Sequence, residues 1–442
     1  GENIAANALL YAVLVRAASL AQIEGDAALA ASYATRAANL KTQINARLWD
    51  TSAGAYRDNP TSTMIPQDGN ALAVWYDVVD SRAKARSISY VLGENWNDKG
   101  SRAPEFTFGT GVPRISTFAG SMELMSHFQA GYDTRGLDMI RSMWGYMLDA
   151  PHGTRSTIWE GLNSDGSFAY QGPFQSLSHG WGTGPTSALT YYVLGLTPDT
   201  VSGQIYHVIP HPGDLTHVEG KLTMAPGKVV FSSYDVGASC QTFSMRVDAQ
   251  AHTGSTGRIG VPRFAANHTV LVNGAAAWNG TSFVGSPGIA GASQDADYIY
   301  FTGVQPGVRT FSYTDGVRCP AAPEQWSFCS DENGTCSFSG TKRVRYGKRG
   351  KYSYGIFTGS VPCTNGMFGD PIANVPKSCQ FSSDLYTACA SEGQTCTFPG
   401  TKEVRFGANG QWVTRIATGS IACTNATFGD PIPNVVKRCE AR

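Results

Sequence analysis

The stretch Asn3-Ile-Ala-Ala-Asn-Ala-Leu-Leu-Tyr-Ala-Val-Leu-Val-Arg-Ala-Ala-Ser-Leu-Ala-Gln-Ile23 decides the fold class of the N-terminal half. Its apolar residues recur three and four positions apart, the spacing of one face of an α-helix. This helix is expected to stop at Glu24-Gly25-Asp26, and a second is expected to run through Asn45 to Trp49. The same periodicity continues to about Leu196, so the region is predicted to be helical.

Further helices are predicted in the same region, separated by loops rich in glycine, proline and aromatic residues. Their expected ranges are 67–79, 82–92, 115–130, 135–148 and 185–194. Paired antiparallel helices with elaborate loops at one end favour an α/α toroid. The expected domain is 1–200, the C-terminal half of an (α/α)6 catalytic barrel, because about seven helices are predicted where such a barrel needs twelve.

Near Ile205 the hydrophobic period changes from about 3.6 to 2, which is typical of strands. Segments 229–234, 242–247, 269–272, 298–302 and 310–313 alternate in this way and are separated by Gly and Asn turns. The sequence therefore predicts a β-sandwich domain over 201–318.

The last part of the chain is an internal duplication, predicted as two Cys-rich β modules, 319–380 and 381–442. Each matched cysteine recurs 60 positions later (389 − 329 and 439 − 379). Modules this small bury little core, so disulfides of about 2–4 kcal/mol each would supply the missing stability. Four cysteines allow three pairings per copy; short loops favour Cys329–Cys336 with Cys363–Cys379, and Cys389–Cys396 with Cys423–Cys439. By parity alone, Cys240 would pair with Cys319.

Composition limits the class of protein and of partner. The 34 basic and 34 acidic residues cancel, so no net charge attracts nucleic acid or an anionic membrane. No apolar run is judged long enough to span a bilayer, and the N-terminus lacks a signal-peptide pattern. Disulfides together with glycosylation sequons predict a secreted, extracellular protein. The sequons lie at Asn267, Asn279, Asn333 and Asn425.

The motifs with the most chemical information are Thr157-Ile-Trp-Glu-Gly161 and Ser176-Leu-Ser-His-Gly-Trp-Gly-Thr-Gly-Pro-Thr186. Two further motifs accompany them, Leu48-Trp-Asp50 and Pro210-His-Pro-Gly-Asp-Leu215. Together these motifs resemble the C-terminal half of the α-L-rhamnosidases, a family of inverting glycoside hydrolases (family 78-like). The resemblance covers about residues 1–316. The resemblance implies an (α/α)6 barrel followed by a β-sandwich, and a terminal α-L-rhamnose as the substrate.

By matching the family motif, Glu160 would be the general base. His179 would contact the sugar, and Trp159 and Trp181 would line or support its pocket. An inverting enzyme needs one carboxylate to activate water and one carboxylic acid to protonate the leaving oxygen. Without the resemblance, the sequence favours a capping or ion-paired loop acid for Glu160, and for His179 it leaves a structural role open.

No segment of this sequence resembles the family's general acid, which lies further N-terminal. We therefore expect an N-terminal fragment or chain to supply it and to complete the barrel, since an open half would expose apolar surface. Within this sequence, Asp68 and Glu105 are the acids best placed to substitute. Asp68 is also expected to bind substrate or, alternatively, to cap the helix that follows it.

Two other functions stay open: a non-catalytic carbohydrate-binding fragment, and a polysaccharide lyase on an α/α toroid, which needs a Tyr/His/Arg group. No cofactor is expected, because no phosphate loop or nucleophile elbow occurs. No metal is expected either, since His207, His211 and His217 lack zinc-site spacing. The basic and aromatic residues of the two Cys-rich modules favour either small structural cores or a pair of lectin-like modules for acidic polysaccharide.

Overall fold

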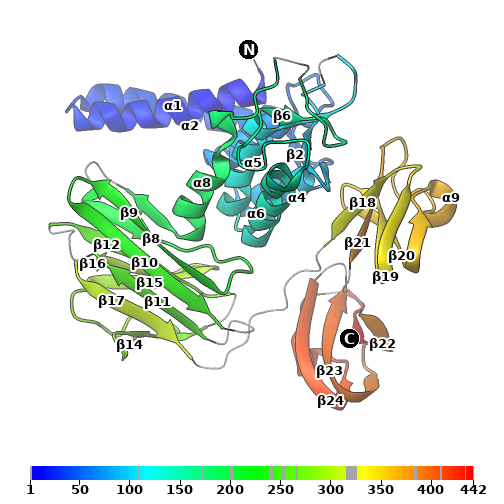
Figure 1. Cartoon of the computed structure of the whole chain (residues 1–442). Coiled ribbons are helices and arrows are strands. Elements are labelled where there is room, and N and C mark those ends of the chain that lie inside the picture. Colours follow the sequence, from blue (N-terminus) through cyan, green and yellow to red (C-terminus); the bar gives the residue numbers. More distant parts are fainter. Residues whose placement is uncertain are drawn as a thin grey trace. The chain divides into compact units, whose positions relative to one another are not determined.

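The computed structural model (Figure 1) describes residues 2–107, 109–170, 174–199, 203–237, 242–249, 254–264, 267–314, 326–382, 386–408, 411–433 and 435–441. The helices and the sandwich form one compact unit, and the two Cys-rich modules belong to a second unit.

The helical part begins with a long antiparallel hairpin of two helices (Figure 1). Asn3 caps α1 by accepting the Ala6 N–H at 3.0 Å, and Asp26 caps α2 by accepting the Leu29 N–H at 2.9 Å. The helices are α1 (Ile4–Ile23), α2 (Ala27–Leu48), α3 (Gln67–Trp75), α4 (Arg82–Gly93), α5 (Thr117–Gln129), α6 (Asp133–Met139), α7 (Gly145–Asp149) and α8 (Gly184–Ala188). All predicted helices are therefore present among the described residues.

Two of the predicted helices contain a π-helical turn. The segment predicted as 135–148 is α6 and α7 joined by the turn Ile140–Trp144, and the segment 185–194 is α8 followed by the turn Leu189–Val193. A π-helical turn inserts one extra residue, which a test for helical periodicity does not detect.

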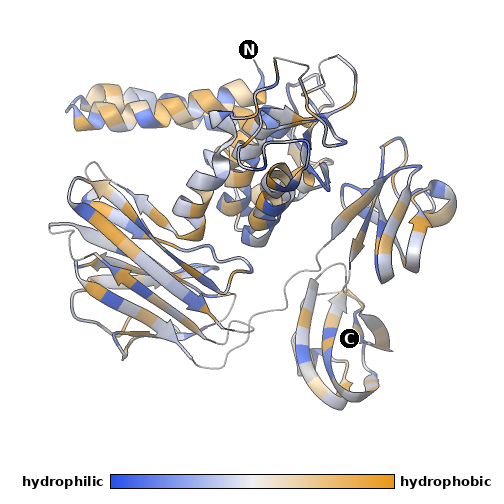
Figure 2. Ribbon diagram, in the orientation of Figure 1, coloured by the Kyte–Doolittle hydropathy of each residue, from blue (hydrophilic) through white to orange (hydrophobic). Residues whose placement is uncertain are grey.

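One face of α1 is exposed although its residues are apolar. Leu9, Val13, Leu20 and Ile23 have 44%, 60%, 63% and 61% of their surface exposed, and Figure 2 shows hydrophobic residues along the hairpin. By length and composition α1 is also sufficient to cross a membrane, so the expectation that no apolar run reaches this length is wrong. In the structure, Ile4 and Ala8 on another side of α1 lie in the helical core.

Short strands hold the loops at one end of the helices. They are β1 (Trp49–Asp50), β2 (Ala55–Tyr56), β3 (Trp96–Asn97), β4 (Gly100–Ala103), β5 (Arg114–Ser116) and β6 (Gly161–Leu162). The last four form one sheet in the order β3-β4-β5-β6. In this sheet β4, which precedes Glu105, and β6, which follows Glu160, pair with the two sides of β5.

The β-sandwich consists of a six-stranded sheet, β14-β13-β17-β11-β10-β9, and a five-stranded sheet, β15-β16-β12-β8-β7. Phe301 and Phe311, one from each sheet, have ring centroids 5.3 Å apart in the shared core. The strands are β7 (Leu196–Pro198), β8 (Ile205–Val208), β9 (His217–Ala225), β10 (Lys228–Val236), β11 (Phe243–Asp248), β12 (Thr256–Pro262), β13 (Thr269–Val272), β14 (Ala275–Asn279), β15 (Gly291–Gln294), β16 (Tyr298–Val304) and β17 (Val308–Tyr313). The helical and β-sandwich regions are thus present, while closure into a toroid stays a prediction.

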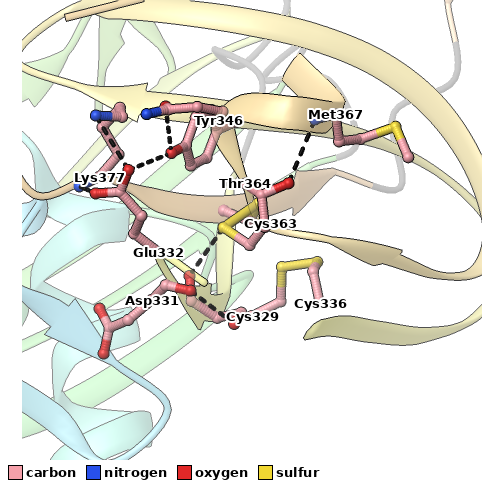
Figure 3. Close-up of a disulfide and its surroundings, with 12 residues drawn as sticks. Cys329, Asp331, Glu332, Cys336, Tyr346, Cys363, Thr364, Met367 and Lys377 are labelled. Atoms are coloured by element: carbon pink, nitrogen blue, oxygen red, sulfur yellow. Dashed lines mark hydrogen bonds and ion pairs between the residues drawn. A yellow bond between two sulfur atoms is a disulfide. The ribbon is translucent and has the colours of Figure 1, made fainter. Parts of the chain in front are cut away.

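Each Cys-rich module is a four-stranded antiparallel sheet with one short helix. The first has β18 (Ser327–Asp331), β19 (Thr335–Lys348), β20 (Lys351–Pro362), α9 (Asn365–Phe368) and β21 (Ser378–Ser382); the second has β22 (Thr387–Ser391), β23 (Thr395–Ala408), β24 (Gln411–Ala422), α10 (Asn425–Phe428) and β25 (Arg438–Ala441). The predicted bridges Cys329–Cys336, Cys363–Cys379, Cys389–Cys396 and Cys423–Cys439 are all present. Figure 3 shows the surroundings of Cys329–Cys336 in the first module. Cys240 and Cys319 lie outside the described residues.

Candidate active site

The two motif segments that carry Glu160 and His179 run beside each other. The Glu160 N–H donates to the Ser176 carbonyl at 3.0 Å, and the His179 N–H donates to the Ile158 carbonyl at 2.9 Å. From the other side, the Thr117 hydroxyl lies 2.8 Å from the Glu160 carbonyl oxygen. The backbone around Glu160 is therefore fixed by both a neighbouring loop and the start of α5.

The side chains of Glu160 and His179 meet at the surface of this loop pair. Glu160 Oε2 lies 3.8 Å from His179 Nδ1, and the two side chains are 16% and 24% exposed. The Ser176 N–H also approaches Glu160 Oε2, at 3.4 Å. The carboxylate is thus oriented but still reachable by water, which a general base requires.

The two motif tryptophans have different environments. Trp159 is fully buried, packs against Phe168 at 5.0 Å between centroids, and lies over Gly153, where a Cβ would approach its ring to 1.9 Å. Trp181 is 52% exposed and its ring is 4.2 Å from that of His179. Of the two, only Trp181 offers a ring face to a ligand in this structure; Trp159 supports the loop from the core.

Tyr170 is a site residue that the sequence reasoning did not select. Burial raises the pKa of its hydroxyl, and the negative charge of Glu160 raises it further. Its ring centroid lies 6.4 Å from that of Phe106. The available signal was the aromatic-rich loop 167–174, whose composition marked it as a loop but singled out no residue.

Asp68 and Glu105 are two neighbouring carboxyl groups near the start of α3. Burial raises the pKa of both, and the charge of Asp68 contributes to raising that of Glu105 to about 7. The Glu105 carboxylate accepts the Gln67 N–H at 3.0 Å and the Asp68 N–H at 2.9 Å. Glu105 therefore satisfies the first turn of α3, and Asp68 lies inside that turn rather than at its N-cap, which is Pro66.

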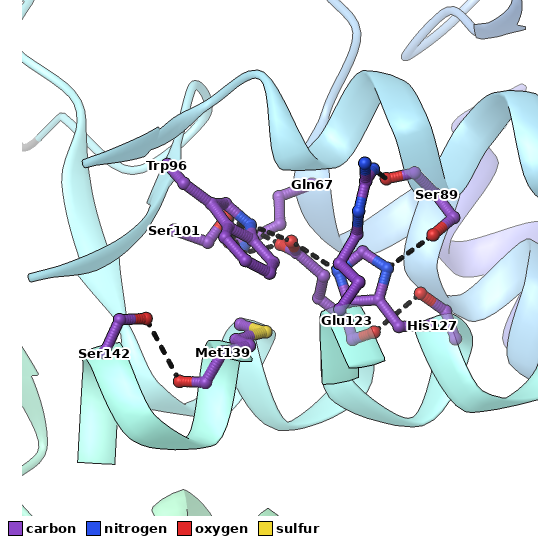
Figure 4. A network of polar contacts seen from close by, with 10 residues as sticks. Gln67, Ser89, Trp96, Ser101, Glu123, His127, Met139 and Ser142 are labelled. Carbon is purple, nitrogen blue, oxygen red and sulfur yellow. Dashed lines mark hydrogen bonds and ion pairs between the residues drawn. The ribbon is translucent and has the colours of Figure 1, made fainter. Parts of the chain in front are cut away.

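Behind this pair lies a buried polar network centred on Glu123 (Figure 4). Its carboxylate accepts hydrogen bonds from Gln67 Nε2 and Trp96 Nε1, both at 2.6 Å, and from the Ser101 hydroxyl at 2.7 Å. Burial by itself would raise the pKa of Glu123, but hydrogen bonds led by that of His127 lower it. Burial also lowers the pKa of His127, so the pair is stable as a carboxylate with a neutral imidazole.

Some expected neighbours are not brought together. In the described part of the chain, no hydrogen bond or ion pair joins Asp68 to Glu160 or His179. His207, His211 and His217 pair separately with Asp199, Asp133 and Asp235. A hollow of about 330 Å³ is lined by residues such as Lys41, Asp77 and Arg82, and Glu160 is not among them.

The start of the chain is similar to a known protein family. Residues 1–100 match the family model of the mannosylglycerate hydrolase MGH1-like glycoside hydrolase domain. This part of the chain is similar to a glycoside hydrolase domain. This glycoside hydrolase relationship is the one that the resemblance predicted, and it applies to the part that contains α1 to α4 and Asp68.

Other similarities are more remote. A 75-residue stretch is 37% identical to the uncharacterized protein L701 of Acanthamoeba polyphaga mimivirus, covering 16% of this chain and 34% of that protein. Among solved structures, an α-L-rhamnosidase from Dictyoglumus thermophilum has a TM-score of 0.48 at 17% identity, with 69% of this chain and 31% of that chain covered. The α-L-rhamnosidase of Streptomyces avermitilis, complexed with L-rhamnose, has a TM-score of 0.49 at 14% identity, with 69% and 26% covered. The chain thus spans about a third or less of these relatives.

Proposed function

We propose that this glycoside hydrolase removes terminal α-L-rhamnose from plant glycosides or polysaccharides with inversion of configuration. The observation that carries the proposal is the placement of Glu160 in the Trp-Glu motif. The backbone of Glu160 is held by hydrogen bonds, and its carboxylate is partly exposed and lies 3.8 Å from His179. The ring of His179 in turn lies 4.2 Å from the exposed ring of Trp181.

In this mechanism Glu160 takes a proton from a water molecule as that water attacks the anomeric carbon. A carboxylic acid on the opposite side protonates the leaving oxygen, and about 6.5–9.5 Å between the two groups leaves room for the water. His179 hydrogen-bonds a sugar hydroxyl, and the face of Trp181 contacts the C–H groups and the methyl group of the deoxy sugar.

We place the general acid on an N-terminal fragment or chain that packs against the exposed apolar face of α1. The support is the exposed surface of α1, where four large apolar side chains are each more than 40% exposed. Covering them with another segment removes apolar surface from water and so lowers the free energy. Mass analysis of the native protein should then detect a second associated polypeptide, and its absence would contradict this arrangement.

Glu105 is a second candidate for the acid, supported by one observation. With a pKa of about 7, raised by burial and then by Asp68, it is substantially protonated at neutral pH, as a general acid must be. The contact between Phe106 and Tyr170 connects its loop to that of Glu160.

The proposal is tested by the stereochemistry of the first product. Proton NMR during hydrolysis of an aryl α-L-rhamnoside should show β-L-rhamnose first, followed by mutarotation. Initial release of the α-anomer would contradict inversion, and absence of hydrolysis by the assembled protein would leave the carbohydrate-binding alternative. We also propose that the protein is secreted and is glycosylated at its four sequon asparagines, all of which are exposed. The four disulfides are compatible with an extracellular protein.

A further inference from the structure

The two Cys-rich modules share a folding core on one side of their sheets. In the first, Lys377 Nζ lies 3.2 Å from both Glu332 and Asp370, beside the disulfides (Figure 3). In the second, Lys437 has the equivalent partners, Glu392 at 3.4 Å and Asp430 at 3.1 Å. The repeated Phe-Gly-Asp-Pro-Ile motif therefore supplies an acidic partner to a buried lysine in each fold, and it does not by itself point to a ligand.

On the other face of each sheet, an arginine side chain lies between two aromatic rings. Arg345 Cζ lies 4.6 Å from the Trp326 ring centroid and 4.2 Å from that of Tyr352. At the matched position (405 − 345 = 60), Arg405 lies 4.0 Å from Tyr386 and 4.3 Å from Trp412. Both arginines are largely buried, with 8% and 4% of their surface exposed.

The charge around this arginine differs between the modules. Arg405 donates through Nε to Glu440 Oε2 at 2.7 Å and is ion-paired with the same oxygen through Nη2 at 2.5 Å. The residue matched to Glu440 is Gln380, whose Oε1 accepts the Arg345 Nε–H at 2.6 Å but brings no charge. Within the described residues, the Nη groups of Arg345 have no hydrogen bond or ion pair.

A second difference between the two modules on this face also makes the first module more basic than the second. Arg343 is paired in register with Ile356 on β20 and lies over the Tyr354 ring at 4.8 Å. The matched residue is Glu403, which accepts a hydrogen bond from Tyr386. The face of the second module therefore contains Glu403 and Glu440 with Arg405 and Arg438, whereas the matched positions of the first module are Arg343, Gln380, Arg345 and Ser378.

These differences have a direct electrostatic meaning. A largely buried guanidinium is costly unless it is paired, and a planar fork of donors matches a carboxylate in two parallel hydrogen bonds. The flanking rings present faces that suit the C–H surfaces of sugars, and Tyr354 is 52% exposed at the side. A carboxylate on a pyranose ring has the charge that Gln380, the neutral partner of Arg345, does not supply, and its planar shape matches the guanidinium.

We propose that the first Cys-rich module binds uronic acid units of an acidic polysaccharide on the face formed by Trp326, Arg343, Arg345, Tyr352 and Tyr354. In the second module the Glu440 carboxylate occupies the place of the ligand carboxylate, so Arg405 is neutralised within the fold. This revises the expectation that both copies bind, and it does not depend on the proposed hydrolase activity.

The test compares matched variants of the full chain in affinity electrophoresis with polygalacturonate at low salt. Wild type should be retarded, and Q380E, which copies the second module, should weaken binding at least tenfold because it supplies an internal carboxylate. The equivalent loss of an arginine in the second module, R405Q, should leave affinity within twofold. Thermal melting of each variant checks that the module remains folded.

Three ligand controls define the chemistry. Fully methyl-esterified polygalacturonate, which keeps the rings and removes the charge, should not retard the protein, and added salt should weaken binding to the acidic form. Equal retardation by dextran sulfate would replace uronate recognition by general anion binding and so overturn the proposal. It is also overturned if folded Q380E binds like wild type, or if R405Q loses as much affinity as Q380E.

Discussion

Glu105 accepts the backbone N–H of Asp68 at 2.9 Å, and the charge of the Asp68 carboxylate helps to raise the pKa of Glu105. The raised pKa values of both groups result first from burial. A helix start that is capped by a partly protonated acid should therefore respond to pH.

Replacing Glu105 by Gln should remove a pH dependence of stability. The folded-state pKa of about 7, raised by burial and by Asp68, exceeds the ordinary 4.5, so the folded protein holds more protons than the unfolded one between these values. The stabilising contribution is complete below about pH 4.5 and is lost as the pH rises through 7, by about 1–3 kcal/mol. Denaturant unfolding at pH 4.5 and pH 8 should show a smaller difference for E105Q than for wild type; equal differences would contradict the coupling.

Replacing His179 by Ala should weaken substrate binding without unfolding the helical domain. The backbone N–H of His179, which pairs the two loops, is retained, and only the partly exposed ring beside Glu160 and Trp181 is removed. We expect a higher KM and a lower kcat with an unchanged melting temperature. Unchanged kinetics, or a large drop in melting temperature, would assign His179 a structural role.

Trp159 and Trp181 offer a matched pair of Trp→Ala substitutions with opposite consequences. Trp159→Ala empties a fully buried site and should cost about 3–5 kcal/mol of unfolding free energy. Trp181→Ala alters a ring that is 52% exposed and should change stability little while reducing affinity for rhamnosides. Urea unfolding and substrate titration of both variants separate these effects, and the reverse pattern would exchange the two assignments.

The exposed face of α1 should mediate association with the proposed N-terminal segment. Val13→Glu with Leu20→Glu places two charges on residues that are 60% and 63% exposed, so the chain should still fold but fail to co-elute with that segment. Gln22→Glu adds a charge at an exposed polar position of the same helix and serves as the control. Association that survives the double substitution would exclude this face.

The helices were predictable because periodicity and caps are local signals, as Asn3 and Asp26 illustrate. The π-helical turn Ile140–Trp144 was not, since one inserted residue within a single turn is too short a change for a test of helical periodicity to detect. In the sandwich, β9 (His217–Ala225) was missed although Val218, Leu222 and Met224 alternate with polar residues, which is the period of a strand. The disulfide pairing followed from the 60-residue repeat and loop length alone.

The site was only partly accessible from the sequence. The Trp-Glu and Ser-Leu-Ser-His-Gly-Trp motifs led to Glu160 and His179, which the loop pairing brings within 3.8 Å. Tyr170 was missed because the influence of Glu160 on it depends on their proximity in space, which no sequence pattern marks. The cap formed by Glu105 on Gln67 and Asp68 spans 38 and 37 positions, and no local pattern reveals such a contact.

The rate of hydrolysis by Glu160→Gln tests the central claim most directly. Glutamine keeps the size of the side chain and removes the proton acceptor, so kcat on an aryl α-L-rhamnoside should fall by roughly 10²–10⁴-fold with binding retained. The measurement uses this chain together with the segment that covers α1, and Glu219→Gln, whose side chain is 65% exposed in the sandwich, is the control that should stay at wild-type rate. Near-normal turnover by Glu160→Gln would contradict the assignment of Glu160 as the general base.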